Sequence, residues 1–143
     1  MNVENWKSEM RAVVCAKLHA ERDRFGDRQL LRFDVGIFPW HGWIELSLLF
    51  TEEAHLLNDV ATWPYYNFSE QQEGKWPQVD ALCKEMAETW SANFLNSETF
   101  FIAVADVIRS DEVQNAIASF KRDEGFCVTL LNPDNAKSPN YYI

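Results

Sequence analysis

The chain has 143 residues and a mass of 16.7 kDa, which is enough for one domain with a sizeable core. Apolar residues make up 47% and charged residues 24%, a globular mixture that excludes disordered and fibrous proteins. The net charge is −9, which disfavours nucleic acid and anionic membranes because binding either requires cationic side chains. This charge favours a basic protein partner.

The sequence has none of the patterns that are typical of membrane-spanning or secreted proteins. The longest apolar run, Phe100 to Ala105, is too short to cross a bilayer. The first residues have no apolar segment typical of a signal peptide. The three cysteines are scattered, as expected for reduced thiols. We therefore expect a cytoplasmic protein with a single domain over residues 1–143.

The chain begins with a predicted helix from Val3 to about Arg24. Its apolar residues recur at steps of three and four and line up on one face: Trp6, Met10, Val13, Val14 and Leu18. Gly26 and Asp27 then end the helix and provide a turn.

Two alternating segments follow, Leu31 to Ile37 and Trp43 to Phe50, which predict a β-hairpin. Pro39 and Gly42 supply the turn between them. One antiparallel register places four apolar pairs on a single buried face, whereas a slip by one residue would bury acidic side chains. The expected pairs are Ile37 with Ile44, Val35 with Leu46, Phe33 with Leu48 and Leu31 with Phe50.

The segment after the hairpin has a weaker pattern. Thr51 is a suitable N-cap for a short helix with acidic residues in its first turn. Residues 63–68 contain a proline and bulky aromatics, which favour an irregular or edge segment. Residues 69–75 are polar and predict a loop.

Two further helices and a strand complete the chain. Pro77 to about Asn96 has an apolar stripe comprising Val79, Leu82, Cys83, Met86, Trp90 and Phe94. A third helix, capped by Ser97, starts near Glu98 and bends around residues 110–112. Residues 126–131 alternate like a strand. The predicted class is α+β, with an antiparallel sheet (hairpin 30–50 plus a C-terminal strand 125–131) packed against three helices.

Motifs for catalysis are weak. The five glycines stand singly, so there is no phosphate-binding loop. On a helix, Glu52, His55 and Asp59 would lie on one side and bind a divalent metal, or form a solvated face. A cysteine paired with His41 is a further alternative, although Cys83 and Cys127 stand in apolar patterns typical of a core. We therefore assign no catalytic residue, metal ligand or cofactor.

Aromatic and acidic residues concentrate between Phe33 and Gly74, a stretch without Lys or Arg. Trp40 and Trp43 flank the hairpin turn and are suited either to anchoring a partner or to filling the core. Acidic residues around an exposed tip would attract a basic partner. The expected partner-binding residues are Trp40, His41, Trp43, Glu45, Glu52, Glu53, Asp59, Trp63, Tyr65 and Tyr66.

Three stretches, 38–47, 59–68 and 131–134, together resemble small bacterial proteins of the domain-of-unknown-function 4303 kind. Some of these look like immunity proteins of bacterial toxin systems. The resemblance extends from about residue 30 to 134 and carries no active site. It implies an acidic binding protein, since an immunity protein that binds a basic nuclease toxin requires this charge sign.

We therefore expect a non-enzymatic, acidic protein-binding domain, of toxin-immunity type, that binds a basic partner. The sequence leaves two alternatives open. One is a small metal-dependent hydrolase that uses Glu52, His55 and Asp59, and the other is a structural homodimer subunit with the aromatic residues at its interface.

Overall fold

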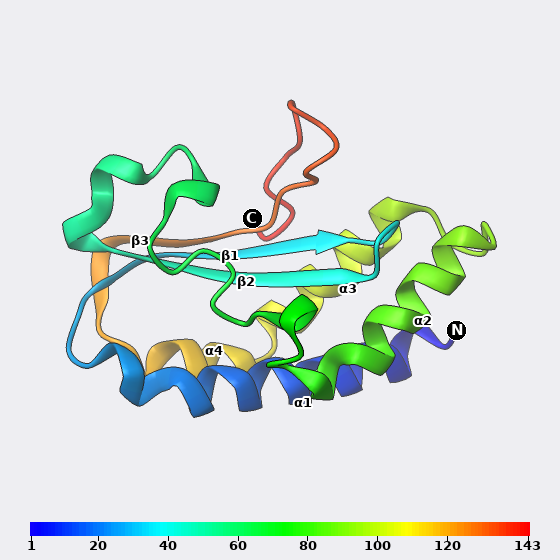
Figure 1. Cartoon of the computed structure of the whole chain (residues 1–143), viewed down its shortest axis with the longest axis horizontal. Helices are drawn as coiled ribbons and strands as arrows, with labels where there is room; N and C mark the ends of the chain where they lie inside the picture. The colour runs from blue at the N-terminus through cyan, green and yellow to red at the C-terminus, as the bar shows by residue number, and fades with distance from the viewer.

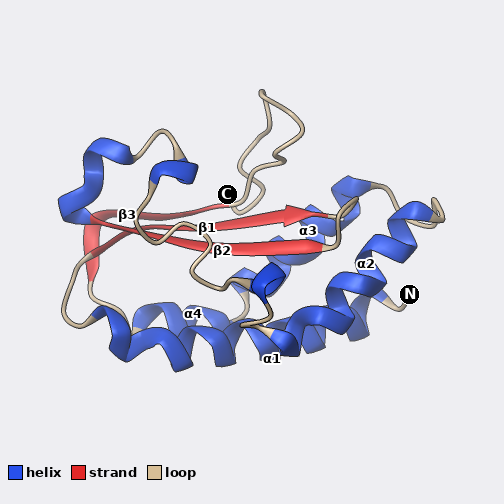
Figure 2. Cartoon of the chain, viewed as in Figure 1, coloured by secondary structure: helices blue, strands red, loops and turns tan.

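A computed structural model describes residues 1–143 and shows a three-stranded sheet with helices against one face (Figures 1 and 2). The strand order is β2-β1-β3. This architecture confirms the α+β class. The elements in chain order are α1 (Val3–Glu21), η1 (Arg22–Phe25), β1 (Leu30–Phe38), β2 (Trp43–Phe50), η2 (Thr51–Leu56), η3 (Val60–Thr62), η4 (Gln71–Glu73), η5 (Pro77–Val79), α2 (Asp80–Ser91), α3 (Ser97–Arg109), α4 (Asp111–Ala118) and β3 (Arg122–Thr129).

Helix α1 forms the base of the helical layer and contacts α3, α4 and α2 (Figure 1). The Asn2 side chain caps it by accepting a hydrogen bond from the Asn5 N–H. The expected apolar face is buried at Trp6, Met10, Val14 and Leu18. The Trp6 indole N–H also donates to the Leu82 carbonyl oxygen at 3.1 Å, which satisfies the polar atom of a fully buried ring and joins α1 to α2.

The hairpin register is confirmed at the pairs Ile37 with Ile44, Val35 with Leu46 and Phe33 with Leu48. The fourth expected pair is wrong, because an irregularity in β1 places Leu30, and not Leu31, opposite Phe50. The irregularity turns Leu31 to the other face of the sheet. There it packs in a small second core with Leu49 and Trp63.

Strand β3 pairs with β1 in parallel, so the sheet is mixed and not wholly antiparallel as expected. The path of the chain explains this direction. Helix α4 ends near the start of β1, where the Leu30 N–H donates to the Lys121 carbonyl oxygen at 2.8 Å. The strand that follows therefore begins beside the start of β1 and runs the same way. It spans Arg122–Thr129, a few residues earlier than expected.

The helical segments are shorter than the periodicity predicted. The second begins as η5 and continues as α2, which ends at Ser91 and leaves Phe94 beyond the helix. Trp90, in the last turn of α2, and Phe94 are both exposed. The third is two helices, α3 and α4, because Ser110 between them has an extended backbone. Asn96, one residue before the expected Ser97, caps α3 by accepting from the Thr99 N–H.

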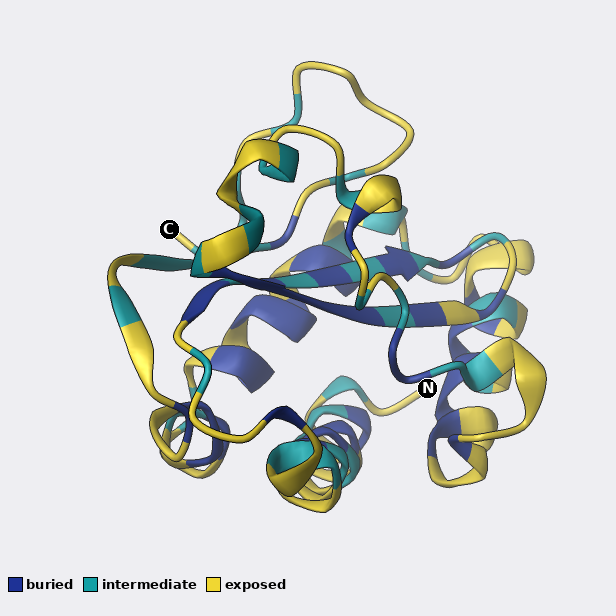
Figure 3. Cartoon of the chain, turned by 60° about the vertical axis from the view of Figure 1, so that its left-hand side comes forward, coloured by how far each residue is buried: buried dark blue, intermediate teal, exposed yellow.

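The main hydrophobic core lies between the sheet and the helices (Figure 3). The segment 51–63 crosses the opposite face of the sheet at one end, where the second core lies. The C-terminal loop rises from that same outer face (Figure 1). None of the helices combines the length and the hydropathy required of a membrane span.

Candidate partner-binding surface at the hairpin end

The turn of the hairpin is fixed by its backbone and by close contact with α2. The N–H groups of His41 and Gly42 both donate to the Phe38 carbonyl oxygen, at 3.0 and 2.9 Å. Gly42 has φ +68°, a conformation that L side chains rarely adopt. A Cβ atom at this position would lie only 3.0 Å from the Cys83 carbonyl oxygen and 3.1 Å from Ala87 Cβ. The turn therefore sits directly on α2.

This contact gathers aromatic rings from the hairpin and from α2. The Phe38 ring lies 6.1 Å from Trp40 and 6.5 Å from Trp43, centroid to centroid. The His41 ring is tilted over Trp43 at 4.7 Å, and Trp40 meets Trp90 edge to face at 6.4 Å. These geometries are favourable for aromatic pairs and restrict the orientation of each ring.

Several of these rings are exposed to solvent. Trp43 is 40% exposed, Trp90 is 37% exposed, and Phe94 in the loop after α2 is 75% exposed. The hairpin turn, the end of α2 and this loop lie at the same end of the molecule (Figure 1). We call this surface the aromatic end, which consists of Phe38, Trp40, His41, Trp43, Trp90 and Phe94.

The electrostatic surroundings of the aromatic end are acidic. It is built from two stretches, Phe33–Gly74 and Glu85–Ile108, that contain no Lys or Arg. Glu45 lies on the same face of β2 as Trp43 and accepts hydrogen bonds from the Tyr66 hydroxyl at 2.7 Å and from Gln72 at 3.2 Å. Burial and the Glu45 carboxylate raise the pKa of Tyr66 to about 12, so the phenol stays a hydrogen-bond donor.

Glu52, Glu53 and Tyr65, which are also predicted to bind the partner, lie at the opposite end of the hairpin. Arg28 pairs with Glu52 at 2.6 Å and with Glu53 at 3.1 Å. A backbone hydrogen bond, followed by the hydrogen bond from Arg28, lowers the pKa of Glu52. The Tyr65 hydroxyl accepts from the same guanidinium. Glu52 and Glu53 belong to a stretch of sequence without Lys or Arg. Arg28, which lies outside that stretch, therefore neutralises both carboxylates.

Trp63 belongs to the second core and not to the surface. It is only 4% exposed, and its indole N–H donates to the Leu56 carbonyl oxygen at 2.8 Å. Asp59 and Tyr66 are exposed, but only Tyr66 adjoins Glu45. The structure thus brings Trp40, His41 and Trp43 together and separates them from Glu52, Glu53, Asp59 and Trp63.

The alternative metal site is not assembled. Residues 51–56 form a 3-10 segment with a kink at Glu53, so the expected α-helical spacing of Glu52, His55 and Asp59 does not occur. Glu52 is engaged by Arg28. No three His, Cys, Asp or Glu side chains of the chain are grouped as metal ligands.

The Cys83 thiol shows no sign of activation. Burial, assisted by the charge of Asp80, raises the pKa of the Cys83 thiol to about 12. A nucleophilic thiol requires the opposite shift. Cys15 and Cys127 are partly buried and form no disulfide.

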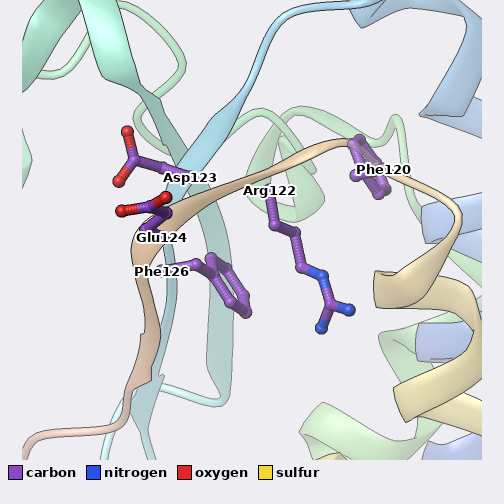
Figure 4. A pocket seen from close by; sticks show the side chains of 5 residues that line it. All are labelled: Phe120, Arg122, Asp123, Glu124 and Phe126. Carbon is purple, nitrogen blue, oxygen red and sulfur yellow. The ribbon is translucent and has the colours of Figure 1, made fainter.

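A hollow of about 490 Å³ lies beside the start of β3 and is lined by Phe120, Arg122, Asp123, Glu124 and Phe126 (Figure 4). The Arg122 side chain points away from the two carboxylates, on the side of Phe126. Asp123 accepts from the Thr51 hydroxyl and from the Gly125 N–H, both at 2.8 Å. Its carboxylate thus has a structural role, and none of the predicted site residues lies here.

Trp90 and Phe94 were missed because their spacing continues the apolar stripe of the helix. Asn93, which has φ +59°, ends the helix in the left-handed conformation that asparagine tolerates. An asparagine directly after the last turn was the available signal that Phe94 lies outside the helix.

Comparison of the chain with protein-family models, curated proteins and solved structures finds no match.

Proposed function

We propose that this protein is a non-enzymatic binding domain whose aromatic end docks on a basic protein. The observation that carries the proposal is the exposure of Trp43, Trp90 and Phe94 at one end of the molecule, on two stretches of the chain that contain no Lys or Arg. Exposed aromatic groups of this kind are more typical of interaction surfaces than of free surface.

The physical properties of these side chains suit an anchor. Trp and Phe bury a large area on binding and lose little conformational entropy, which is why aromatic residues dominate binding energy at interfaces. The contact of the tilted His41 ring with Trp43 and the contact of Trp40 with Trp90 hold the rings in place before a partner arrives. Such preorganisation favours affinity.

The charge of the protein suits a basic partner. With a net charge of −9 and an aromatic end free of Lys and Arg, the surface attracts cationic proteins and accelerates their association. Toxin neutralisation, as implied by the resemblance to immunity-like proteins, is one role that uses this chemistry. Glu45 remains available for attraction, whereas Glu52 and Glu53 are held by Arg28.

The experiment is a tagged pull-down from a lysate of the source cells at low and high salt, read by mass spectrometry, followed by binding kinetics with the purified partner. The test compares the wild type with Trp43→Ala and Trp90→Ala. Ile102→Ala is the matched control, because Ile102 is an exposed apolar residue on α3. We expect a basic partner whose dissociation accelerates in both tryptophan variants and is unchanged in the control.

Equal binding by all three variants would refute the aromatic end as the binding surface. Light scattering at several protein concentrations tests the alternative in which the same surface joins two copies of the chain. A dimer that Trp43→Ala dissociates would replace the basic partner with a second copy.

A further inference from the structure

Opposite charges on the outer face of the sheet stand beside one another without pairing. Arg32 and Asp34 are two residues apart on β1, so they project from the same face with Cα atoms about 7 Å apart. They form no ion pair with each other. Arg32 Nη1 donates to the carbonyl oxygens of Leu31 at 2.8 Å and Gly125 at 2.7 Å, while the sole hydrogen-bond partner of Asp34 is the Thr129 hydroxyl.

These charges line a cavity of about 360 Å³ between the outer face of the sheet, the segment 57–63 and the start of the C-terminal loop. The strands form a polar floor, and one wall is apolar. The lining residues are Arg32, Asp34, Leu57, Asn58, Val60, Trp63, Cys127, Thr129 and Leu131. An apolar wall with a few fixed polar groups is the usual composition of a small-molecule site, and the volume lies near the lower end of the usual range of about 300–1,000 Å³.

We propose that this cavity binds a small zwitterion, an α-amino acid with an apolar side chain. The ammonium group binds the Asp34 carboxylate, the carboxylate binds the free edge of the Arg32 guanidinium, and the side chain packs against Leu57, Val60 and Trp63.

The presence of both charges in one cavity supports this class of ligand. An amino acid carries its ammonium and carboxylate on a single carbon, so one ligand of this class can form a charge-assisted hydrogen bond with each of the two opposite charges that line the cavity. A simple organic cation satisfies only Asp34, and a simple anion satisfies only Arg32. The small cavity volume restricts the ligand to a single residue with its side chain.

The groups around Asp34 affect its protonation and therefore its affinity for a cationic ligand. Thr129 and Cys127 lie beside it on β3, Glu45 acts on it from β2, and Tyr66 lies close enough to interact with it. The guanidinium of Arg32, from its own strand, is directed to the Gly125 carbonyl oxygen and acts on Asp123. Burial, reinforced by Glu45, raises the pKa of Asp34 to about 6. The carboxylate is therefore ionised at neutral pH but protonated at pH 5, and the affinity for an ammonium group falls accordingly.

Calorimetry with L-phenylalanine and L-leucine tests the proposal at pH 7 up to about 10 mM. The probes that lack one charge are 2-phenylethylamine and 3-phenylpropanoate. We expect the amino acids to bind and each half-probe to bind at least roughly tenfold more weakly, because one charge-assisted hydrogen bond is lost. Asp34→Asn and Arg32→Met weaken binding similarly, whereas Asp59→Asn, an exposed carboxylate outside the cavity, leaves it unchanged.

Thiol labelling gives a second readout that does not depend on a variant folding. Cys127 lines the cavity, whereas Cys15 lines a separate groove beside α1. A bound amino acid slows the modification of Cys127 by N-ethylmaleimide and leaves that of Cys15 unchanged, as followed by mass spectrometry. Absence of both heat and protection, or equal binding of 2-phenylethylamine and phenylalanine, overturns the proposal. Trp43→Ala retains amino-acid binding, which separates this site from the aromatic end.

Discussion

Trp40 and Trp90 meet edge to face, with ring centroids 6.4 Å apart, although one belongs to the hairpin turn and the other to the end of α2. The contact depends on the close approach of Gly42 to Cys83 and Ala87, which seats the turn on the helix. The hairpin turn and the end of α2 therefore present their aromatic groups as one surface, and the loop that carries Phe94 lies at the same end of the molecule. This arrangement gives the proposed binding function a rigid base.

Replacing Trp90 by alanine distinguishes an aromatic group on the surface from one in the core. Trp90 is 37% exposed, so we expect its removal to lower the free energy of unfolding by about 1 kcal/mol. Trp76 is fully buried, and Trp76→Ala should cost about 3–5 kcal/mol through the cavity it leaves. Urea unfolding followed by circular dichroism measures both changes. Similar losses in the two variants would place Trp90 in the core.

Alanine substitutions at Gly42 and Gly74 separate the effect on stability of contact with α2 from the effect of backbone strain. Both have positive φ, +68° and +77°, so alanine is strained at each by about 1–2 kcal/mol. At Gly42 the added Cβ also meets Cys83 and Ala87, whereas nothing lies within 4 Å at Gly74. We expect Gly42→Ala to be the more destabilising by urea unfolding and to change the near-UV circular dichroism of the tryptophans. Equal losses would show that the turn does not press on α2.

The sequence predicted the hairpin well because the alternation of β1 and β2 admits only one register with an apolar inner face. That argument pairs residues one to one and assumes that neither strand contains an extra residue. It therefore does not predict the irregularity that turns Leu31 to the outer face. The alternation of apolar and polar residues also does not predict the direction of β3. Parallel and antiparallel strands can show the same alternation, and the choice here follows from where α4 ends.

For the candidate site, the sequence located the aromatic turn but not its neighbours. Trp40, His41 and Trp43 are adjacent in the chain, so their proximity needed no knowledge of the fold. Phe94 required the end of α2 to be placed correctly, and the exposure of Trp90 required knowing which side of that last turn the hairpin covers. The predicted acidic surface failed at Glu52 and Glu53 because Arg28 reaches them from a distant part of the chain, and a local charge count does not include such a partner.

Arg28 has a structural role that its substitution should reveal. Its guanidinium lies 4.2 Å above the Phe50 ring, and it pairs with Glu53, which is largely buried. Arg28→Ala removes both contacts and should lower the free energy of unfolding by about 2 kcal/mol. Arg122 forms no ion pair, is exposed and lies farther from its aromatic neighbour, 5.8 Å from the Phe126 ring centroid, so Arg122→Ala should change stability by less than about 0.5 kcal/mol. Equal effects in chemical unfolding would contradict this role for Arg28.

Asp34 should make the protein less stable as the pH rises. Its pKa is raised from 3.8 to about 6 in the folded protein, so folded Asp34 binds its proton more tightly than unfolded Asp34. Below about pH 4 the carboxyl is protonated in both states and carries no penalty. Between about pH 4 and 6 the unfolded chain ionises first, and stability falls until a penalty of about 3 kcal/mol is reached above pH 6.

Asp34→Asn removes this penalty and retains an acceptor for the Thr129 hydroxyl. We expect the variant to exceed the wild type in the free energy of unfolding by up to about 3 kcal/mol at pH 7 and to match it near pH 4, in urea titrations at both values. Asp123 is the control of opposite sign. The Gly125 N–H and the Thr51 hydroxyl lower its pKa, so its stabilisation is present at pH 7 and is lost as the pH falls, and Asp123→Asn should be less stable than the wild type at pH 7. A gain for Asp34→Asn that does not change with pH would show that the charge of Asp34 is not its cause. A gain confined to neutral pH means that the protein keeps an unpaired carboxylate at the expense of stability, as expected where that charge serves to bind a ligand.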